Sequence, residues 1–370
     1  RLYFSDDEIY RMLPTFIVAT VDKFAGIAKN RRFKNLFGGK LSECAEHGFI
    51  PRNDKCMFKT APRKSCNNLG DPLECDFNTG PSLIIQDEMH LIKEGFGTID
   101  SHFESLCEVL EEEFSGERVK HIVMTATVSG AKNQIEQLYN KNVRIFPPTL
   151  KDNQDNDFFF KENSSKMQRK IIGLKPSIPK SKILYYILRY ISEFIKDVEE
   201  DITNFSSEHD FEVNELENIL GFYKKFLTYH NKKNDAQNTN YYIEEFVNSK
   251  DCYRFDSRPL TGENSLEDIK EVISTVKNFY DDENKKKELC LINATSIVSH
   301  GVDIDDWNIM IFDGMPRSTS EYIQALSRVG RKKIGLLFLT FFNNRTRDLS
   351  FYQHFNEYHK ILQDKVENVP

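Results

Sequence analysis

The chain has 370 residues, of which 39% are hydrophobic and 12% aromatic, and its formal net charge at pH 7 is −7. This length suits about two domains, and the apolar content excludes an intrinsically disordered chain. No apolar run approaches the roughly 18 residues of a membrane-spanning helix, and no signal-peptide pattern is present, so no membrane partner is expected. The seven cysteines are odd in number and thinly spread, which favours a reducing, cytoplasmic location over a disulfide framework.

The first predicted element is a short strand in the apolar stretch 13–19. Thr20 and Lys23 follow it, where a helix is expected to begin. A hydroxyl and an ammonium group at such a junction can hold a phosphate, because the helix N-terminus adds free N–H groups. An ordinary helix N-cap explains Thr20 equally well.

Residues 38–80 are rich in glycine, proline and cysteine and have few periodic apolar positions. Cys44 and His47 are separated by two residues, the gap that lets one turn offer two ligands to a single Zn²⁺. A metal would supply the folding energy that this segment lacks. The later spacings fit no standard zinc knuckle, and free cysteines in a long loop are the alternative. A zinc site would use four of five candidate ligands: Cys44, His47, Cys56, Cys66 and Cys75.

A short apolar run, residues 83–85, ends in two adjacent carboxylates. The run predicts a strand buried on both faces. Asp87 and Glu88 follow it as the Walker B acids of P-loop NTPases follow their strand. In that arrangement Asp87 coordinates Mg²⁺, and Glu88 orients and deprotonates the attacking water. The plain alternative is an acidic turn, and His90 on the same rim is interpreted as a reporter of the nucleotide state.

A helix over 99–114 and a strand over 121–124 are predicted next. The strand follows the acid-bearing strand by about one helical crossover, as the next parallel strand of an α/β sheet does. It ends in the small residues Thr125, Ala126 and Thr127. The Thr-Ala-Thr triplet alone indicates little, but its position after the acid-bearing strand is informative about the function.

Two adjacent prolines and the polar run 151–166 indicate a linker between domains. A basic segment follows at 166–182, which is either a face for a phosphate backbone or a solvated surface. Amphipathic helices are predicted over 181–198 and 211–226, and residues 229–256 receive no assignment.

The last third of the chain contains three further predicted strands, 290–294, 309–312 and 334–342. Between the second and third of these strands, Gln324, Arg328 and Arg331 recur at gaps of four and three, which places them on one face of a helix. Guanidinium groups can stabilise charge on a transferring γ-phosphate. An exposed basic helix end is the alternative, because cations also favour the helix C-terminus.

Together these segments resemble the motifs of superfamily 2 helicases of the DEAD/DEAH-like type, in the same order along the chain. Residues 87–90, 125–127, 294–303 and 324–331 are similar to motifs II, III, V and VI, and residues 20–23 to motif Ib. Within the superfamily, four stretches look like the large helicase subunit of the DISARM anti-phage system: residues 19–25, 84–92, 321–331 and 347–355.

The resemblance implies an α/β fold of two RecA-like domains with parallel sheets, the first truncated at its N-terminus. Residues 1–150 would be the partial first domain, with the Cys-rich insertion at about 38–80. Residues 151–166 would be the linker and 167–370 the second domain. The resemblance also implies ATP and Mg²⁺ in the cleft between the domains and a nucleic-acid strand across both, with DNA favoured over RNA. Partner subunits of a defence complex are expected as well.

Roles of single residues are implied by their positions in the motifs. The catalytic group would be Asp87, Glu88, His90, Gln324, Arg328 and Arg331. The residues that line the nucleotide would be Gly301 and Asp303. The residues that couple the nucleotide to the strand would be Thr125, Ala126 and Thr127. The contacts to the nucleic-acid backbone would be Thr20, Lys23 and Thr295.

One departure from the family is serious, because the sequence contains no Gly-x-x-x-x-Gly-Lys-Ser/Thr loop. We interpret the chain as truncated upstream of Arg1, and expect this fragment alone to bind ATP poorly and hydrolyse almost none. Motif V also carries His300 where valine is common. Two other interpretations are a nucleic-acid-binding scaffold with a vestigial ATPase site and a metal-dependent nuclease that uses Asp87, Glu88 and His90.

Overall fold

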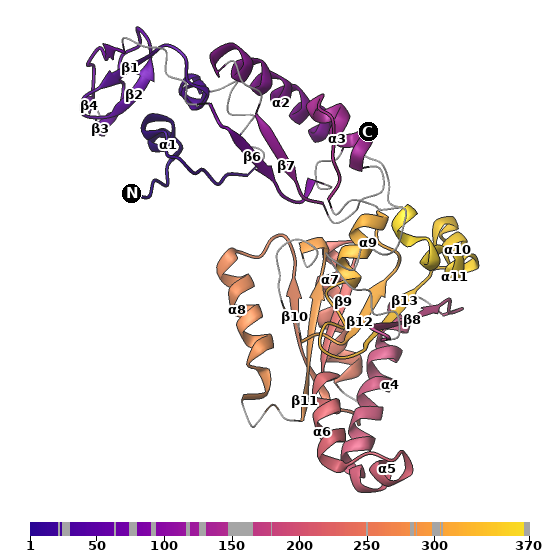
Figure 1. The fold of residues 1–370 in the computed structure, drawn as a ribbon. Coiled ribbons are helices and arrows are strands. Elements are labelled where there is room, and N and C mark those ends of the chain that lie inside the picture. Colours follow the sequence, from indigo (N-terminus) through magenta and orange to yellow (C-terminus); the bar gives the residue numbers. More distant parts are fainter. Residues whose placement is uncertain are drawn as a thin grey trace. The chain divides into compact units, whose positions relative to one another are not determined.

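The structure is a computed structural model, and it describes residues 1–20, 23, 30–62, 64–73, 80–89, 94–115, 119–125, 131–146, 166–178, 180–248, 251–281, 285, 287–297, 304 and 306–365. The chain divides into two compact units, Arg1–Thr149 and Leu150–Glu367 (Figure 1). Each unit is described by itself. In the described part of the chain, no helix is both long and apolar enough to cross a membrane.

The second unit is built on a six-stranded sheet in which every pair of neighbours is parallel (Figure 1). The strand order is β10-β11-β9-β12-β13-β8. Since all strands run in one direction, their carboxyl ends meet at one edge, where open α/β sheets bind ligands. The strands are β8 (Arg169–Leu174), β9 (Lys225–His230), β10 (Arg254–Leu260), β11 (Glu288–Ala294), β12 (Ile309–Asp313) and β13 (Gly335–Thr340).

Both faces of this sheet are covered, which explains why its central strands are almost continuously apolar. In β11, Cys290 and Ile292 belong to one core cluster, whereas Leu289 and Leu291 belong to the other, because successive side chains of a strand point to opposite faces. The first cluster also contains Trp307, which is fully buried.

The helices of the second unit surround this sheet. The α-helices are α4 (Lys180–Glu200), α5 (Ile202–Glu208), α6 (Val213–Phe222), α7 (Lys233–Tyr242), α8 (Leu266–Lys277), α9 (Thr319–Leu326), α10 (Thr346–Gln353) and α11 (Phe355–Lys360). Short turns of other helix types in the described residues are η5 (Ile243–Val247), η6 (Phe279–Asp281) and η9 (Leu362–Lys365).

In its described residues, the first unit contains a parallel strand pair and several small antiparallel pairings. The parallel pair is β6 (Leu83–Gln86) with β7 (Lys120–Val123). The remaining elements are α1 (Asp6–Met12), η2 (Arg31–Phe37), β1 (Leu41–Cys44), β2 (Gly48–Pro51), β3 (Lys59–Ala61), β4 (Lys64–Ser65), β5 (Asp71–Pro72), α2 (Glu94–Ser115) and α3 (Ala131–Tyr139).

Two predictions about the first unit are wrong. Residues 13–19 do not form a strand, and Phe16 and Val18 are 78% and 80% exposed. A strand needs a neighbour to pair with, and none of the described strands lies against this stretch. β6 is a strand as predicted, but it is not buried on both faces, because Leu83 and Ile85 are exposed.

The predicted helix 211–226 is also partly wrong, because α6 ends at Phe222 and β9 begins at Lys225. The apolar residues of β9 continue the helical spacing of α6, which hides the boundary in the sequence. The unassigned stretch 229–256 contains α7, η5 and the start of β10.

Candidate functional site

The two adjacent acids lie at the carboxyl end of β6. Asp87 is exposed and Glu88 is half-buried, and the Glu88 N–H donates to Asp87 Oδ1 at 2.9 Å. Glu88 has a φ of +52°, a left-handed conformation that is costly for a residue with a side chain and is concentrated at functional sites.

The end of β7 lies against this acidic turn. The Met124 N–H donates to the Gln86 carbonyl at 2.8 Å, and the Met89 N–H donates to the Met124 carbonyl at 3.1 Å. Thr125 is therefore next to the residues that flank Asp87 and Glu88. The structure brings these three predicted site residues to one edge of the parallel pair.

Thr20 and Lys23 lie in one turn, in which the Lys23 N–H donates to the Thr20 carbonyl at 3.0 Å. The Lys23 ammonium forms an ion pair with Asp6 of α1 at 2.8 Å, and both side chains are about half-exposed. A phosphate at this position would compete with Asp6 for the ammonium group.

In the second unit, Thr295 follows the carboxyl end of β11 and is 7% exposed. Its N–H donates to the carbonyl of Leu260, the last residue of the neighbouring strand β10, at 3.2 Å. Thr295 thus lies at the carboxyl edge of the six-stranded sheet.

The prediction that Gln324, Arg328 and Arg331 share one helix face is wrong. Gln324 lies within α9 and is 6% exposed, whereas α9 ends at Leu326. Arg328, half-buried, and Arg331, exposed, follow in a non-helical turn.

Gly330 explains why the chain after Leu326 does not continue as a helix. Its φ is +78°, and a Cβ at this position would lie 2.7 Å from the Gln168 carbonyl oxygen and 2.8 Å from the Gly335 nitrogen. The Gly330 N–H donates to the Trp307 carbonyl at 3.2 Å. These contacts tie the arginine-bearing turn to the amino ends of β8, β12 and β13, the sheet edge opposite Thr295.

Arg169, at the start of β8, is a residue that the sequence interpretation did not identify as part of this site. Its Nε donates to the Val329 carbonyl at 2.7 Å, and one Nη donates to the Ser327 carbonyl at 3.4 Å. Burial and the nearby Arg331 lower the Arg169 pKa. Arg169 therefore holds the turn that contains Arg328 and Arg331. In the sequence, only its position within the basic segment 166–182 points to it.

A second overlooked group is a buried polar network at the carboxyl edge of the sheet. His230 Nδ1 lies 3.1 Å from an Asp313 carboxylate oxygen, and His230 Nε2 lies 3.0 Å from Thr228 Oγ1. Asn293 continues the network, with a contact to Thr228 and a 2.8 Å hydrogen bond to Ser257. The network joins four neighbouring strands, β12, β9, β11 and β10.

The structure brings together four of the five predicted zinc ligands. One ligand atom of each of Cys44, His47, Cys56 and Cys66 lies within 4.8 Å of the others. Burial raises the pKa of the Cys44 thiol, but hydrogen bonds from the Glu46 and His47 backbone amides and the His47 side chain bring it down to about 7. Burial raises the pKa of the Cys56 thiol.

Six of the predicted site residues lie outside the described part of the chain. They are Cys75, His90, Ala126, Thr127, Gly301 and Asp303.

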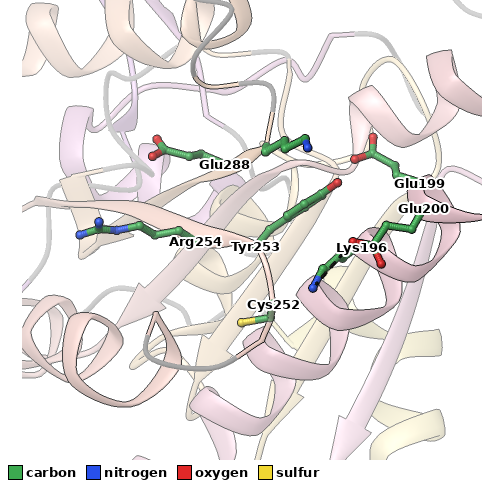
Figure 2. Close-up of a pocket in the computed structure, with 8 residues that line it drawn as sticks. Lys196, Glu199, Glu200, Cys252, Tyr253, Arg254 and Glu288 are labelled. Carbon is green, nitrogen blue, oxygen red and sulfur yellow. Dashed lines mark ion pairs between the residues drawn. The ribbon is translucent and has the colours of Figure 1, made fainter.

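A cavity of about 650 Å³ lies elsewhere in the second unit (Figure 2). It is lined by Lys196 and Glu199 of α4, by Tyr253, and by the first residues of β10 and β11, Arg254 and Glu288. It is therefore at the amino ends of these two strands, and it contains none of the predicted site residues.

Comparisons with known proteins agree with this fold. Residues 212–333 match the helicase conserved C-terminal domain. The chain is 30% identical to the DISARM protein DrmA of Bacillus paralicheniformis over 383 residues, which cover 99% of this chain and 32% of DrmA. It thus spans about a third of that relative's length.

Two solved structures of the DUF1998 helicase MrfA share the fold at 15% identity. The one bound to DNA has a TM-score of 0.53 over 78% of this chain and 32% of MrfA. The one bound to DNA and AMPPNP has a TM-score of 0.50 over 78% of this chain and 34% of MrfA.

The parallel sheet, the arginine-bearing turn after α9 and these matches show a RecA-like fold whose residues 212–333 match the helicase C-terminal domain, and the chain as a whole is similar to superfamily 2 helicases. Within that superfamily it resembles the DISARM protein DrmA.

Proposed function

We propose that this chain is part of an ATP-driven motor that moves along a nucleic-acid strand. The observation that carries the proposal is in residues 212–333, which match the helicase C-terminal domain. They include the central strands of the parallel sheet and end just past the turn with Arg328 and Arg331.

The acidic turn after β6 has the donor set that Mg²⁺ prefers. Mg²⁺ is bound by carboxylate, hydroxyl and phosphate oxygens, and exposed Asp87 offers a carboxylate at the carboxyl end of a parallel strand. Asp87 would hold the ion, which neutralises phosphate charge when bound. Glu88 would orient the attacking water and accept its proton, and we assign His90 to the same catalytic group. Thr125, together with Ala126 and Thr127, would couple the state of the nucleotide to the bound nucleic-acid strand.

The second unit would supply positive charge and strand contacts. Arg328 and Arg331 would stabilise the charge that develops on the γ-phosphate, and we assign Gln324 to the same catalytic group. Gly301 and Asp303 would line the nucleotide. At the opposite sheet edge Thr295 would contact the nucleic-acid backbone, as would Thr20 and Lys23 of the first unit.

We favour DNA over RNA as the strand, because the helicase MrfA, which shares the fold, was solved with DNA. We also propose a role in a DISARM defence system, which the similarity to the DISARM protein DrmA supports. A cytoplasmic location and partner subunits of a defence complex are part of the same proposal. Stimulation of ATP hydrolysis by single-stranded RNA but not by single-stranded DNA would overturn the choice of strand.

The test compares the full-length gene product with the 370-residue chain. We expect ATP hydrolysis stimulated by single-stranded DNA in the former and almost none in the latter, because the chain has no Walker A loop. Glu88→Gln and Arg331→Ala should each lower turnover by about 10²–10³-fold, the size of a lost transition-state contact. The exposed residues Glu112 and Arg144 provide matched controls, Glu112→Gln and Arg144→Ala, which should retain full activity.

Two outcomes would favour other functions. DNA binding without hydrolysis in the full-length protein would indicate a scaffold with a vestigial ATPase site. Cleavage of DNA with Mg²⁺ and no nucleotide would indicate a nuclease that uses Asp87, Glu88 and His90.

A further inference from the structure

The strongest unexplained cluster is the group of three thiols and one imidazole in the insertion of the first unit. Two separate hairpin-like segments supply its members. Cys44 and His47 lie in the turn that joins β1 to β2, whose register pairs Cys44 with Gly48. Gly48 has a φ of +79°, and a Cβ there would lie 2.6 Å from the Arg11 carbonyl oxygen. Only glycine fits this close approach, which places the turn against the end of α1.

The other two thiols are held by a short antiparallel ladder. The Met57 N–H donates to the Cys66 carbonyl at 2.8 Å, and the Cys66 N–H donates to the Phe58 carbonyl at 2.8 Å. This ladder brings Cys56 and Cys66 close together although nine residues separate them in the sequence. Each pair of candidate ligands is thus fixed by backbone hydrogen bonds.

The spacing of the ligand atoms suits a tetrahedral metal ion. With Zn–S bonds of about 2.3 Å and a Zn–N bond of about 2.0 Å, the edges of the tetrahedron measure roughly 3.5–3.8 Å. The distance between Cys44 Sγ and His47 Nδ1 is 3.6 Å, and all four ligand atoms lie within 4.8 Å of one another. A small contraction of the side chains would complete the tetrahedron.

We propose that Cys44, His47, Cys56 and Cys66 bind one structural zinc ion, and that Arg11 neutralises the net negative charge of the bound site. Three sulfur ligands and one nitrogen ligand are the donor set of a closed structural zinc site. His47 would bind through Nδ1, and its ring stacks on Phe58 with 4.5 Å between the ring centroids.

The buried side chain of Arg11 supports the zinc site independently of the ligand geometry. Its side chain is only 1% exposed, and one Nη lies 3.3 Å from Cys56 Sγ while the other donates to the Cys56 carbonyl at 2.5 Å. A buried guanidinium requires negative partners. Asp7 is one such partner, at 3.2 Å from Arg11 Nε, but it also forms an ion pair with Arg32.

One carboxylate thus serves two guanidinium groups, which gives this cluster an excess of one positive charge among the residues that the structure describes. Three thiolates and one Zn²⁺ carry a net charge of −1, which balances it. The N–H groups of Arg11 would then be the hydrogen-bond donors that orient a zinc-bound thiolate, as outer contacts of metal sites do.

Elemental analysis of the purified chain under reducing conditions tests the metal directly. We expect close to one zinc per chain, and Co²⁺ added after zinc removal should give the thiolate charge-transfer and tetrahedral d–d absorption of a three-sulfur site. Cys66→Ser should lower the zinc content severalfold, whereas Cys66→His should retain it. The control Cys252→Ser changes a half-buried cysteine of the second unit and should keep full zinc. A zinc ratio near zero with no cobalt–thiolate absorption, or equal loss in the control, would overturn the site.

The role of Arg11 has its own readout, the rate at which a chelator removes zinc from the folded chain. Arg11→Met should speed removal by about 10–100-fold, the usual effect of losing an outer contact to a metal ligand. Arg11→Lys, which keeps the charge without the same N–H geometry, should have an intermediate rate. Arg52→Met, at an exposed arginine of the same insertion, is the matched control. Equal rates for Arg11→Met and Arg52→Met would overturn the charge-neutralising role.

Discussion

The Nε atom of Arg169 donates to the carbonyl oxygen of Val329 at a distance of 2.7 Å. The two residues are 160 positions apart in the sequence, at the start of β8 and in the turn after α9. This bond anchors the backbone between Arg328 and Arg331, so the positions of both guanidinium groups depend on a third arginine that is itself turned inward.

Replacing Arg169 should therefore destabilise the second unit. Arg169→Met removes a charge-assisted hydrogen bond to a partly buried carbonyl, which should lower the free energy of unfolding by about 1.5–3 kcal/mol. Trp307, the only tryptophan of the chain and fully buried in this unit, reports unfolding by its fluorescence in a urea titration. Lys170→Met, at the exposed next residue of β8, should change stability by less than about 0.5 kcal/mol. Equal effects of the two substitutions would contradict the anchoring role.

Gly330 should tolerate no side chain. Gly330→Ala would force a Cβ to within 2.8 Å of two backbone atoms at a φ of +78°, and we expect a loss of about 2–4 kcal/mol. Gly221→Ala, near the end of α6, meets no atom within 4 Å and should stabilise the unit by up to about 1 kcal/mol. The same Trp307 titration measures both, and a stable Gly330→Ala variant would show that the turn can rearrange.

These two residues illustrate what the sequence could and could not predict. The strand before Asp87, the parallel strand before Thr125 and the pair Cys44 and His47 were all recognisable, because each depends on neighbours in the sequence. The end of α9 was missed, because the residues after Leu326 keep a helical spacing while distant contacts of Gly330 fix another conformation. Arg169 and Arg11 act on partners 160 and 45 positions away, and no local pattern records such pairs.

The pair His230 and Asp313 should be important for stability at the carboxyl edge of the sheet. Their side chains are 0% and 6% exposed, so Asp313→Ala would leave the His230 ring without this acceptor, at a cost of about 2–4 kcal/mol. Asp306→Ala is the control, because that carboxylate is 25% exposed beside Lys225 and Lys332 and should cost less than about 1 kcal/mol. A double-mutant cycle with His230→Phe would separate their interaction from other losses. A coupling energy near zero would contradict the importance of the pair.

Glu111 of α2 should make the first unit less stable as the pH rises. Burial raises the pKa of its carboxyl group to about 7, with Lys141 lowering it and Glu108 raising it. A folded-state pKa above the ordinary value means that stability is highest when the group is protonated, and declines between about pH 4.5 and 7. At pH 8 the neutral variant Glu111→Gln should be more stable than the wild type by about 1–3 kcal/mol.

Hydrogen exchange of the α2 amides at several pH values measures this difference in the first unit alone. The advantage of Glu111→Gln should vanish near pH 4.5. His121 also titrates, since burial and Lys141 lower its pKa to about 4, but it is present in both proteins and its contribution largely cancels in the comparison. Glu112→Gln, at the exposed adjacent position, should show no such dependence on pH. An advantage of Glu111→Gln that is the same at pH 4.5 and pH 8 would rule out titration of Glu111 as its cause.

The contact between Arg11 and Cys56 also predicts that the two residues are inherited together. In a homologue whose insertion had been lost, a guanidinium at position 11 would have neither its sulfur nor its carbonyl partner. Lineages without the insertion should therefore have exchanged that arginine for an apolar residue, and an alignment in which the two features are inherited separately would argue against their interdependence.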